Sequence, residues 1–355
     1  MGLLVISANF LAGLVIVSLA AWGVALWRGR RRRWVSATGF GALAMVLSLL
    51  TVADFVNAHY AFLPRVADVL GVRTWPSARL TEVSTPLARP EAAHPRGAVV
   101  SVRLPGVESG FGAPTAMVYF PPQYFTEPSR RFPVVYLLHG SPGAPVDWFR
   151  AARASDAGYA VAHAGHPVIL VAPRASHNWT DDSECVDRPK EHVATYVVKD
   201  VVREIDARFR TIPTRSARAV AGNSAGGYCA LNLGLRNRGL FSAVIDLSGF
   251  DRPTHDGGLR GLFGDLPNLA RVAAANTPLA YIPKLSPSPQ VRLWLDCGRS
   301  DKTARLDTLN ISQELVDRGF HVVLRIRPGG HDYGVWRPAL AEGLSWAAAG
   351  LNGSA

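Results

Sequence analysis

Two long uncharged apolar segments open the chain. The first covers residues 3–27, and the second covers residues 36–52 and ends before Asp54. At about 1.5 Å of rise per residue, the first segment is long enough to cross a hydrocarbon core of roughly 30 Å. The pattern therefore predicts two transmembrane helices, at about residues 3–27 and 34–53.

Arginines fill the short segment between the two predicted spans. Arg28 and the four arginines at 30–33 give the loop 28–33 five positive charges, whereas no charged side chain precedes the first span. Short loops rich in arginine stay on the cytoplasmic side of the membrane. Both ends of this two-helix anchor, residues 1–57, should therefore face the extracytoplasmic side. A cleaved signal peptide is the alternative, but its positive charges would precede a shorter apolar run. We expect a multi-pass protein of the cell membrane that is extracytoplasmic after about residue 57.

Residues 58–96 are predicted to connect the anchor to a folded domain. Apolar residues recur at near-helical spacing between residues 55 and 72, which predicts a short amphipathic helix beside the membrane. Residues 74–97 are rich in proline, alanine and arginine, which is typical of an extended linker.

Strand-like and helix-like patterns alternate through the remaining segment, residues 97–355. Apolar runs typical of buried strands fall at 98–104, 114–120, 132–138, 167–172, 217–221, 243–248, 291–295 and 321–326. Helical patterns fall at 192–210, 225–235, 303–318 and 333–351. This alternation predicts an α/β domain with a mostly parallel central sheet and helices on both faces. Ligands of such sheets bind at the carboxyl ends of the strands.

Charge and cysteine content narrow the function classes. The formal net charge is +11, but five of these charges lie in the arginine loop. No basic stripe interleaved with aromatic residues follows, so we predict no nucleic-acid partner. The three cysteines fit no zinc site and no CxxC pair, and we predict no metal or cofactor. Cys185 and Cys229 could form a disulfide outside the cytoplasm or remain buried thiols.

The motif that carries chemistry is Gly222-Asn-Ser-Ala-Gly226, a complete G-x-S-x-G. An apolar strand-like run precedes it and a run of small helix-forming residues follows it. This context predicts a nucleophile elbow, a sharp strand-to-helix turn that exposes the serine oxygen. Ser224 is therefore the predicted nucleophile.

A nucleophilic serine needs a base that is itself held by an acid. His331 follows the last predicted strand, directly after two glycines, and is the predicted base. Asp301, in the loop after the preceding strand, is the favoured acid, with Asp251 and Asp296 as alternatives. The order serine, acid, histidine is that of the α/β-hydrolase fold.

The tetrahedral oxyanion formed in acyl transfer needs main-chain donors. One is predicted to be the N–H of Ala225, the residue after the nucleophile. The other is predicted to be the N–H of Ser141, in the glycine-containing loop after the strand at 132–138. His139, Gly140, Trp148 and Tyr333 are predicted to contact the substrate.

Four motifs together resemble those of a known family: Leu137-Leu-His-Gly-Ser-Pro-Gly143, Gly222-Asn-Ser-Ala-Gly-Gly227, Asp296-Cys-Gly-Arg-Ser-Asp301 and Gly330-His-Asp-Tyr-Gly-Val-Trp336. They look like those of the putative esterase family, which includes esterase D (S-formylglutathione hydrolase) and the antigen 85 mycolyltransferases. The resemblance covers roughly residues 97–350. It implies Ser224, Asp301 and His331 as a catalytic triad, and the amides of Ser141 and Ala225 as the oxyanion hole.

The expected function is that of a membrane-anchored, extracytoplasmic serine esterase or acyltransferase. It would act on a small-molecule, lipid or carbohydrate ester through an acyl-enzyme. The alternative is a non-catalytic, hydrolase-like protein of the cell envelope that binds carbohydrate or lipid. The presence of all three candidate triad residues favours the enzyme.

Overall fold

The computed structural model describes residues 8–31, 34–63, 65–70, 72–84 and 94–351. The chain divides into two compact units, which we describe separately. One comprises residues 1–74 together with 332–334, and the other comprises 75–331 together with 335–355. The predicted start of the first span at residue 3 and the part of the predicted linker at residues 85–93 lie outside the described residues.

The N-terminal unit contains two long apolar helices, α1 (Ala8–Arg30) and α2 (Trp34–Tyr60). The stretches Ala12–Arg30 and Trp34–Asn57 are long and apolar enough to cross a membrane, and few of their side chains are buried. Polar contacts join the helices, since the hydroxyls of Ser18 and Ser48 lie 2.9 Å apart. Apolar side chains exposed on both helices would be unfavourable in water, so length and composition suit a lipid environment.

The helix boundaries differ from those predicted. The first helix continues through Arg30, so it includes part of the segment predicted as loop 28–33. The second continues to Tyr60 and absorbs the start of the predicted juxtamembrane helix, of which only the short α3 (Val66–Val69) remains separate. The hydropathy pattern marks only the uncharged core of each helix, whereas the helical backbone continues into the flanking residues. A further short helix, α4 (Leu80–Ser84), lies in the segment predicted as linker.

The larger unit is built on an eight-stranded sheet with the strand order β1-β2-β4-β3-β7-β8-β9-β10. In sequence order the strands are β1 (Ala98–Arg103), β2 (Thr115–Phe120), β3 (Val134–Leu138), β4 (Ile169–Ala172), β7 (Arg218–Asn223), β8 (Ala243–Leu247), β9 (Arg292–Gly298) and β10 (Val322–Arg327). The pairs β1–β2 and β2–β4 are antiparallel, and the rest are parallel. The predicted mostly parallel sheet is confirmed.

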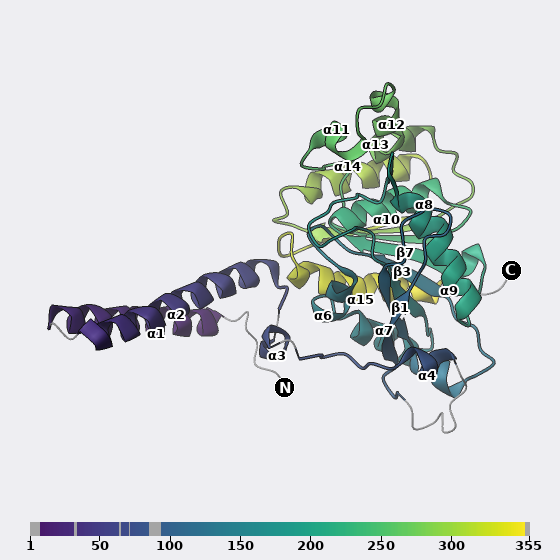
Figure 1. Cartoon of the computed structure of the whole chain (residues 1–355). Helices are drawn as coiled ribbons and strands as arrows, with labels where there is room; N and C mark the ends of the chain where they lie inside the picture. Colours follow the sequence, from purple (N-terminus) through teal and green to yellow (C-terminus); the bar gives the residue numbers. More distant parts are fainter. Residues whose placement is uncertain (1–7, 32–33, 64, 71, 85–93, 352–355) are drawn as a thin grey trace. The chain divides into compact units, whose positions relative to one another are not determined.

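Helices cover both faces of this sheet (Figure 1). Neighbouring residues of a strand point to opposite faces, and β8 shows the result. Val244 packs against Gly234 of α10 (Ala225–Arg236), whereas Ile245 packs against Gly343 of α15 (Tyr333–Ala349). The remaining helices are α5 (Pro122–Thr126), α6 (Pro145–Arg150), α7 (Ala154–His163), α8 (Val193–Thr195), α9 (Val202–Arg208), α11 (Gly258–Phe263), α12 (Leu269–Ala275), α13 (Pro278–Tyr281) and α14 (Ala304–Asp317).

The helix predicted at residues 192–210 is interrupted by a π-helical turn at Tyr196–Val201, between α8 and α9. Asp200 lies in this turn with no exposed surface. Its carboxylate accepts hydrogen bonds of 2.9 Å from the main-chain N–H groups of Glu108 and Ser109. These hydrogen bonds stabilise the charged side chain of Asp200 on the helix face that the periodicity predicts to be apolar.

A disulfide joins Cys185 to Cys229, so the open question about these cysteines is settled in favour of pairing. Cys185 lies in the loop after β4, and Cys229 lies in α10, five residues after Ser224. Both residues are buried. The bond therefore fixes the loop after β4 to the helix that follows the elbow.

Replacing both bonded cysteines by serine should lower the free energy of unfolding by about 2–5 kcal/mol. The two cysteines are 44 residues apart, and without the bond the unfolded chain between them regains its conformational entropy. Denaturant unfolding of the full chain in detergent measures this change. Cys297→Ser, which alters a buried free thiol, is the matched control. Equal losses in the two variants would contradict a cross-link effect.

Candidate active site

The strand-to-helix turn at Ser224 has the geometry of a nucleophile elbow. Ser224 has φ 56° and ψ −126° and immediately precedes α10. A Cβ at Gly222 would lie 1.7 Å from the carbonyl oxygen of Gly226, and a Cβ at Gly226 would lie 2.0 Å from that of Leu138. Only glycine fits at these two positions, which explains why the motif requires it. The strained φ of Ser224 is held by the packing on both sides.

Three side chains meet in a hydrogen-bonded chain at the carboxyl edge of the sheet. His331 Nε2 lies 2.8 Å from Ser224 Oγ, and His331 Nδ1 lies 2.7 Å from Asp301 Oδ2. An ionised carboxylate only accepts, so Nδ1 carries the hydrogen and Nε2 accepts from the serine hydroxyl. The structure thus brings together the three residues that the sequence predicted to act as nucleophile, base and acid.

The carboxylate of Asp301 is held in its ionised form. Burial by itself raises its pKa, but hydrogen bonding and charge from His331, the N–H of Ala304 and the hydroxyl of Ser248 outweigh burial and leave the pKa below its usual range. Oδ1 also accepts from the N–H groups of Thr303 at 3.2 Å and Ala304 at 3.0 Å, at the start of α14. Asp301 therefore both caps this helix and orients the imidazole.

The two alternative acids have other partners. Asp296 is fully buried and accepts from Nε of Arg327 at 2.8 Å. Asp251 accepts from Arg252 at 2.7 Å. Of the three candidates, the contacts of the described residues join Asp301 to His331.

Two aromatic rings contact the imidazole, and the sequence had identified neither as a part of the site. Phe250 stacks on His331 with ring centroids 6.0 Å apart and an interplanar angle of 17°. The Trp336 ring lies nearly perpendicular to the imidazole, with ring centroids 4.9 Å apart and an interplanar angle of 87°. Phe250 lies in the loop after β8 and Trp336 in α15, so only the fold brings both rings to His331. These rings limit the orientations open to the base.

The loop after β3 lies directly against the nucleophile. A Cβ at Gly140 would be 3.3 Å from Ser224 Cβ, so the Gly140–Ser141 peptide is adjacent to the serine side chain. The N–H of Gly143 donates to the carbonyl of Trp179 at 2.8 Å, which fastens the loop to the segment after β4. The predicted oxyanion donors, Ser141 and Ala225, therefore come from two segments that both adjoin Ser224.

His139 has a different place from the one predicted. Its side chain is buried, and both ring nitrogens contact the main chain: Nε2 accepts from the N–H of Ala175 at 3.2 Å, and Nδ1 donates to the carbonyl of Gly140 at 2.9 Å. Burial lowers the pKa of His139 to about 4, so the ring is neutral. The carbonyl of Gly140 shares a peptide unit with the N–H of Ser141. His139 therefore holds the Gly140–Ser141 peptide in place, and its buried ring offers little surface to a substrate.

The other predicted substrate contacts have mixed outcomes. Gly140 adjoins the nucleophile. Trp148 lies in α6 and is 1% exposed. A side chain so deeply buried has almost no surface to offer a ligand, which corrects its predicted role. Tyr333 is the first residue of α15, two positions after His331, and its role as a substrate contact stays a prediction.

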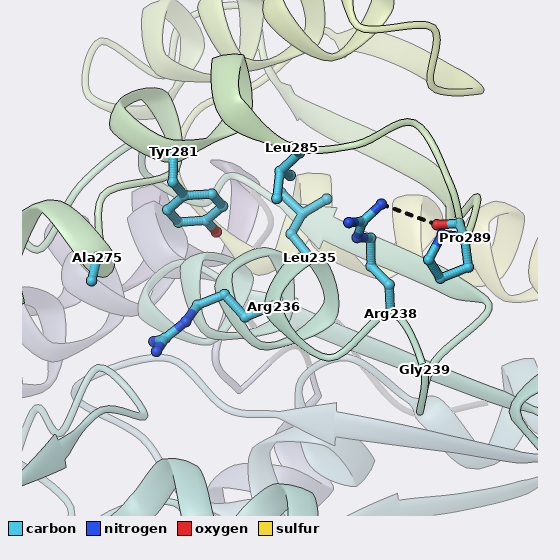
Figure 2. A pocket seen from close by; sticks show the side chains of 8 residues that line it. All are labelled: Leu235, Arg236, Arg238, Gly239, Ala275, Tyr281, Leu285 and Pro289. Carbon is cyan, nitrogen blue, oxygen red and sulfur yellow. Dashed lines mark hydrogen bonds between the residues drawn. The ribbon is translucent and has the colours of Figure 1, made fainter.

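A pocket of about 490 Å³ lies away from these residues (Figure 2). It adjoins Leu235 and Arg236 at the last turn of α10, together with residues of the segment 275–289. Ser224 lies at the other end of this 12-residue helix, a separation of roughly 18 Å along the axis. The pocket is therefore separate from the cluster of Ser224, His331 and Asp301. Among the described residues, no group of three His, Cys, Asp or Glu side chains is arranged to hold a metal ion.

The fold and the hydrogen-bonded serine, histidine and aspartate define a serine hydrolase of the α/β-hydrolase class. Residues 112–347 match the model of the family described as putative esterase. The chain belongs to this family, which confirms the resemblance seen in the sequence, and it is a carboxylic-ester hydrolase by class.

Individual proteins are also similar to this chain. The chain is 27% identical to an uncharacterized protein of Corynebacterium glutamicum, over 95% of this chain and 80% of that protein. Among solved structures, a ferulic acid esterase matches with a TM-score of 0.62 and 24% identity, over 72% of this chain and 99% of that chain. An S-formylglutathione hydrolase from Agrobacterium tumefaciens matches with a TM-score of 0.59 and 17% identity, over 72% of this chain and 95% of that chain. At these identities the two solved structures establish the shared fold.

The buried neutral His139 should make the protein sensitive to acid. Its pKa falls from 6.5 to about 4 on folding, so between these values the unfolded chain binds more protons and stability falls as the pH is lowered. The free energy of unfolding should fall by up to about 3 kcal/mol across this pH range. His139→Asn, which cannot take up the proton, should flatten this slope in denaturant unfolding between pH 7 and 4.

The exposed His163→Asn variant is the control for this experiment and should keep the slope of the unaltered protein. An unchanged slope in His139→Asn would show that other groups cause the acid sensitivity. His139→Asn should also lower kcat, because Ala175 loses its acceptor and the Gly140–Ser141 peptide is less firmly held.

Proposed function

We propose that this protein is a serine esterase or acyltransferase that works through an acyl-enzyme on Ser224. The observation that carries the proposal is the unbroken hydrogen-bonded chain from Ser224 Oγ through the His331 ring to the Asp301 carboxylate. In this arrangement His331 Nε2 takes the serine proton as Oγ attacks the ester carbonyl carbon. His331 then returns the proton to the leaving alkoxide, and the acyl group remains on Ser224 Oγ.

The second half of the reaction reverses these roles. His331 removes a proton from water or from an acceptor hydroxyl, whose oxygen attacks the acyl carbon. The proton then passes to Ser224 Oγ as the acyl bond breaks. In both halves the N–H groups of Ser141 and Ala225 would stabilise the negative carbonyl oxygen, and one such donor typically contributes about 2.7–4 kcal/mol.

Ser224→Ala should lower kcat for hydrolysis of p-nitrophenyl esters by at least about 10⁴-fold, because no nucleophile remains for the acyl-enzyme. The variant should also fail to react covalently with a fluorophosphonate probe, as intact-protein mass spectrometry would show. Ser242→Ala, at the other end of β8, is the control and should retain activity. A Ser224→Ala protein that still hydrolysed these esters at the original rate would refute the mechanism.

We further propose that the catalytic unit lies outside the cytoplasm, held at the membrane by α1 and α2. Three features support this: the two apolar helices, the arginines between them, and the disulfide between Cys185 and Cys229, a bond typical of oxidising compartments. A catalytic unit held at a membrane meets lipid or cell-surface glycan esters at high local concentration. Esters of these classes are the proposed substrates.

The proposed topology places the catalytic unit and the Arg28–Arg31 segment on opposite sides of the membrane. Reporter fusions test it, since alkaline phosphatase is active only outside the cytoplasm. A fusion after residue 355 should be active, and a fusion after Arg31 should be inactive. The reverse result would overturn the topology without affecting the proposed chemistry.

A further inference from the structure

Asp246 is a buried carboxyl residue that the proposed mechanism does not use. It lies in β8 and is 1% exposed. Val244 packs on α10, and Asp246, two residues later on the strand, points to the same face of the sheet. A Cβ at Gly227 would lie only 2.5 Å from Asp246 Oδ1, so the carboxyl group packs directly on the first turn of α10. Aspartate is rarely buried so completely unless it has a specific partner.

One oxygen of this carboxyl group closes the turn that follows β8. Oδ1 accepts a hydrogen bond of 2.7 Å from the main-chain N–H of Gly249, which is buried. Oδ2 is also buried and has no hydrogen-bond partner among the residues that the structure describes. Burial raises the pKa of Asp246 to about 7, so the carboxyl group is neutral in mildly acidic solution. The contact with Gly249 therefore needs an acceptor oxygen at this position and does not need a negative charge.

The turn closed by this bond, residues 247–250, contacts the nucleophile through its backbone. The carbonyl of Leu247 accepts from the N–H of Ser224 at 2.9 Å. A Cβ at Gly249 would lie 2.6 Å from the main-chain nitrogen of Tyr228, so the turn packs against the helix that directly follows Ser224. A shift of the turn would therefore reach the elbow.

The same turn carries both aromatic contacts of the base. Phe250 stacks on His331 with ring centroids 6.0 Å apart. Ser248 Oγ accepts from Nε1 of Trp336 at 3.0 Å, and the Trp336 ring lies nearly perpendicular to the imidazole. The turn 247–250 thus connects the surroundings of the base to those of the nucleophile.

The backbone of this turn is strained and needs restraint. Ser248 has φ 58°, an unfavourable value for a residue with a Cβ. The bond from Gly249 to Asp246 spans Ser248, and the N–H of Ser248 donates to the carbonyl of Asp296 at 2.8 Å. Such strain persists only where the surrounding contacts maintain it, and it is typical of functional sites.

We propose that Asp246 is a positioning residue whose hydrogen bond to Gly249 holds the turn 247–250 in the conformation that aligns Ser224 with His331. This role rests on the proposed triad mechanism. Without the acceptor, the buried N–H of Gly249 would lose its partner, and the strained residue between them would lose a restraint. The resulting shift would change the alignment of the reacting groups, on which the rate depends steeply.

The experiment compares full-length Asp246→Ala with Asp246→Asn in p-nitrophenyl ester hydrolysis, with rates expressed per folded protein. Asp246→Ala should lower kcat by about 10- to 100-fold, with KM changed less than about twofold. Labelling of Ser224 by a fluorophosphonate probe should slow by a similar factor. Asp246→Asn should restore kcat to within about threefold of the original, because its amide oxygen can accept from Gly249 in the same way.

Asp200→Ala is the matched control. Asp200 also has no exposed surface, and its carboxylate accepts from the main-chain N–H groups of Glu108 and Ser109. Its hydrogen bonds reach neither the turn 247–250 nor the triad. The control variant should be less stable than the original protein and keep kcat within about twofold.

Four results would overturn the proposal. They are a kcat within twofold of the original in Asp246→Ala, a loss in Asp246→Asn as large as in Asp246→Ala, an equal loss of kcat in Asp200→Ala, and a loss confined to KM. If Asp246→Ala fails to fold, Phe250→Leu tests the contact between the turn and His331. A lower kcat with unchanged KM in that variant, together with an active Asp246→Asn, supports the proposal, and an unchanged kcat overturns it. Activity retained in Ser224→Ala would instead refute the triad mechanism itself.

Discussion

The close backbone approach at the elbow is the constraint on which the rest of the catalytic unit depends. The first turn of α10 lies so near the end of β3 that no side chain fits at Gly226. The carbonyl of Gly226 in turn lies so near β7 that none fits at Gly222. This approach brings Ser224 beside the Gly140–Ser141 peptide. The parallel register of β3, β7 and β8 brings their carboxyl ends to the same edge of the sheet. A bulkier residue at either glycine would separate these elements.

Placing Asp301 beside His331 buries a negative charge, which must be stabilised by hydrogen-bond donors on several sides. The main-chain N–H groups of Thr303 and Ala304 and the imidazole of His331 meet this need. They belong to separate segments of the chain, the start of α14 and the loop after β10. The acid is therefore stabilised by the convergence of these elements, and the same convergence fixes its orientation.

His139 and the disulfide show how the loops around the nucleophile are kept rigid. The neutral ring of His139 connects the segment after β4 to the Gly140–Ser141 peptide. The Cys185–Cys229 bond connects a later part of that segment to α10. Preorganised main-chain donors are effective because little reorganisation is needed during reaction. The hydrogen bonds of His139 and the Cys185–Cys229 disulfide both hold the surroundings of Ser224 in place before any substrate binds.

The sequence by itself determined the features that depend on local pattern. Two uncharged apolar runs, alternating strands and helices, the G-x-S-x-G motif and the order of Ser224, Asp301 and His331 were all visible in it, because hydropathy, periodicity and turn chemistry act over short distances. Only the tertiary structure decided between Asp301, Asp296 and Asp251, paired Cys185 with Cys229, buried Trp148, and turned His139 toward the backbone. It also joined Ser248 to Trp336, 88 residues apart. Each of these outcomes depends on which elements pack together across the sheet, and no local pattern specifies that packing.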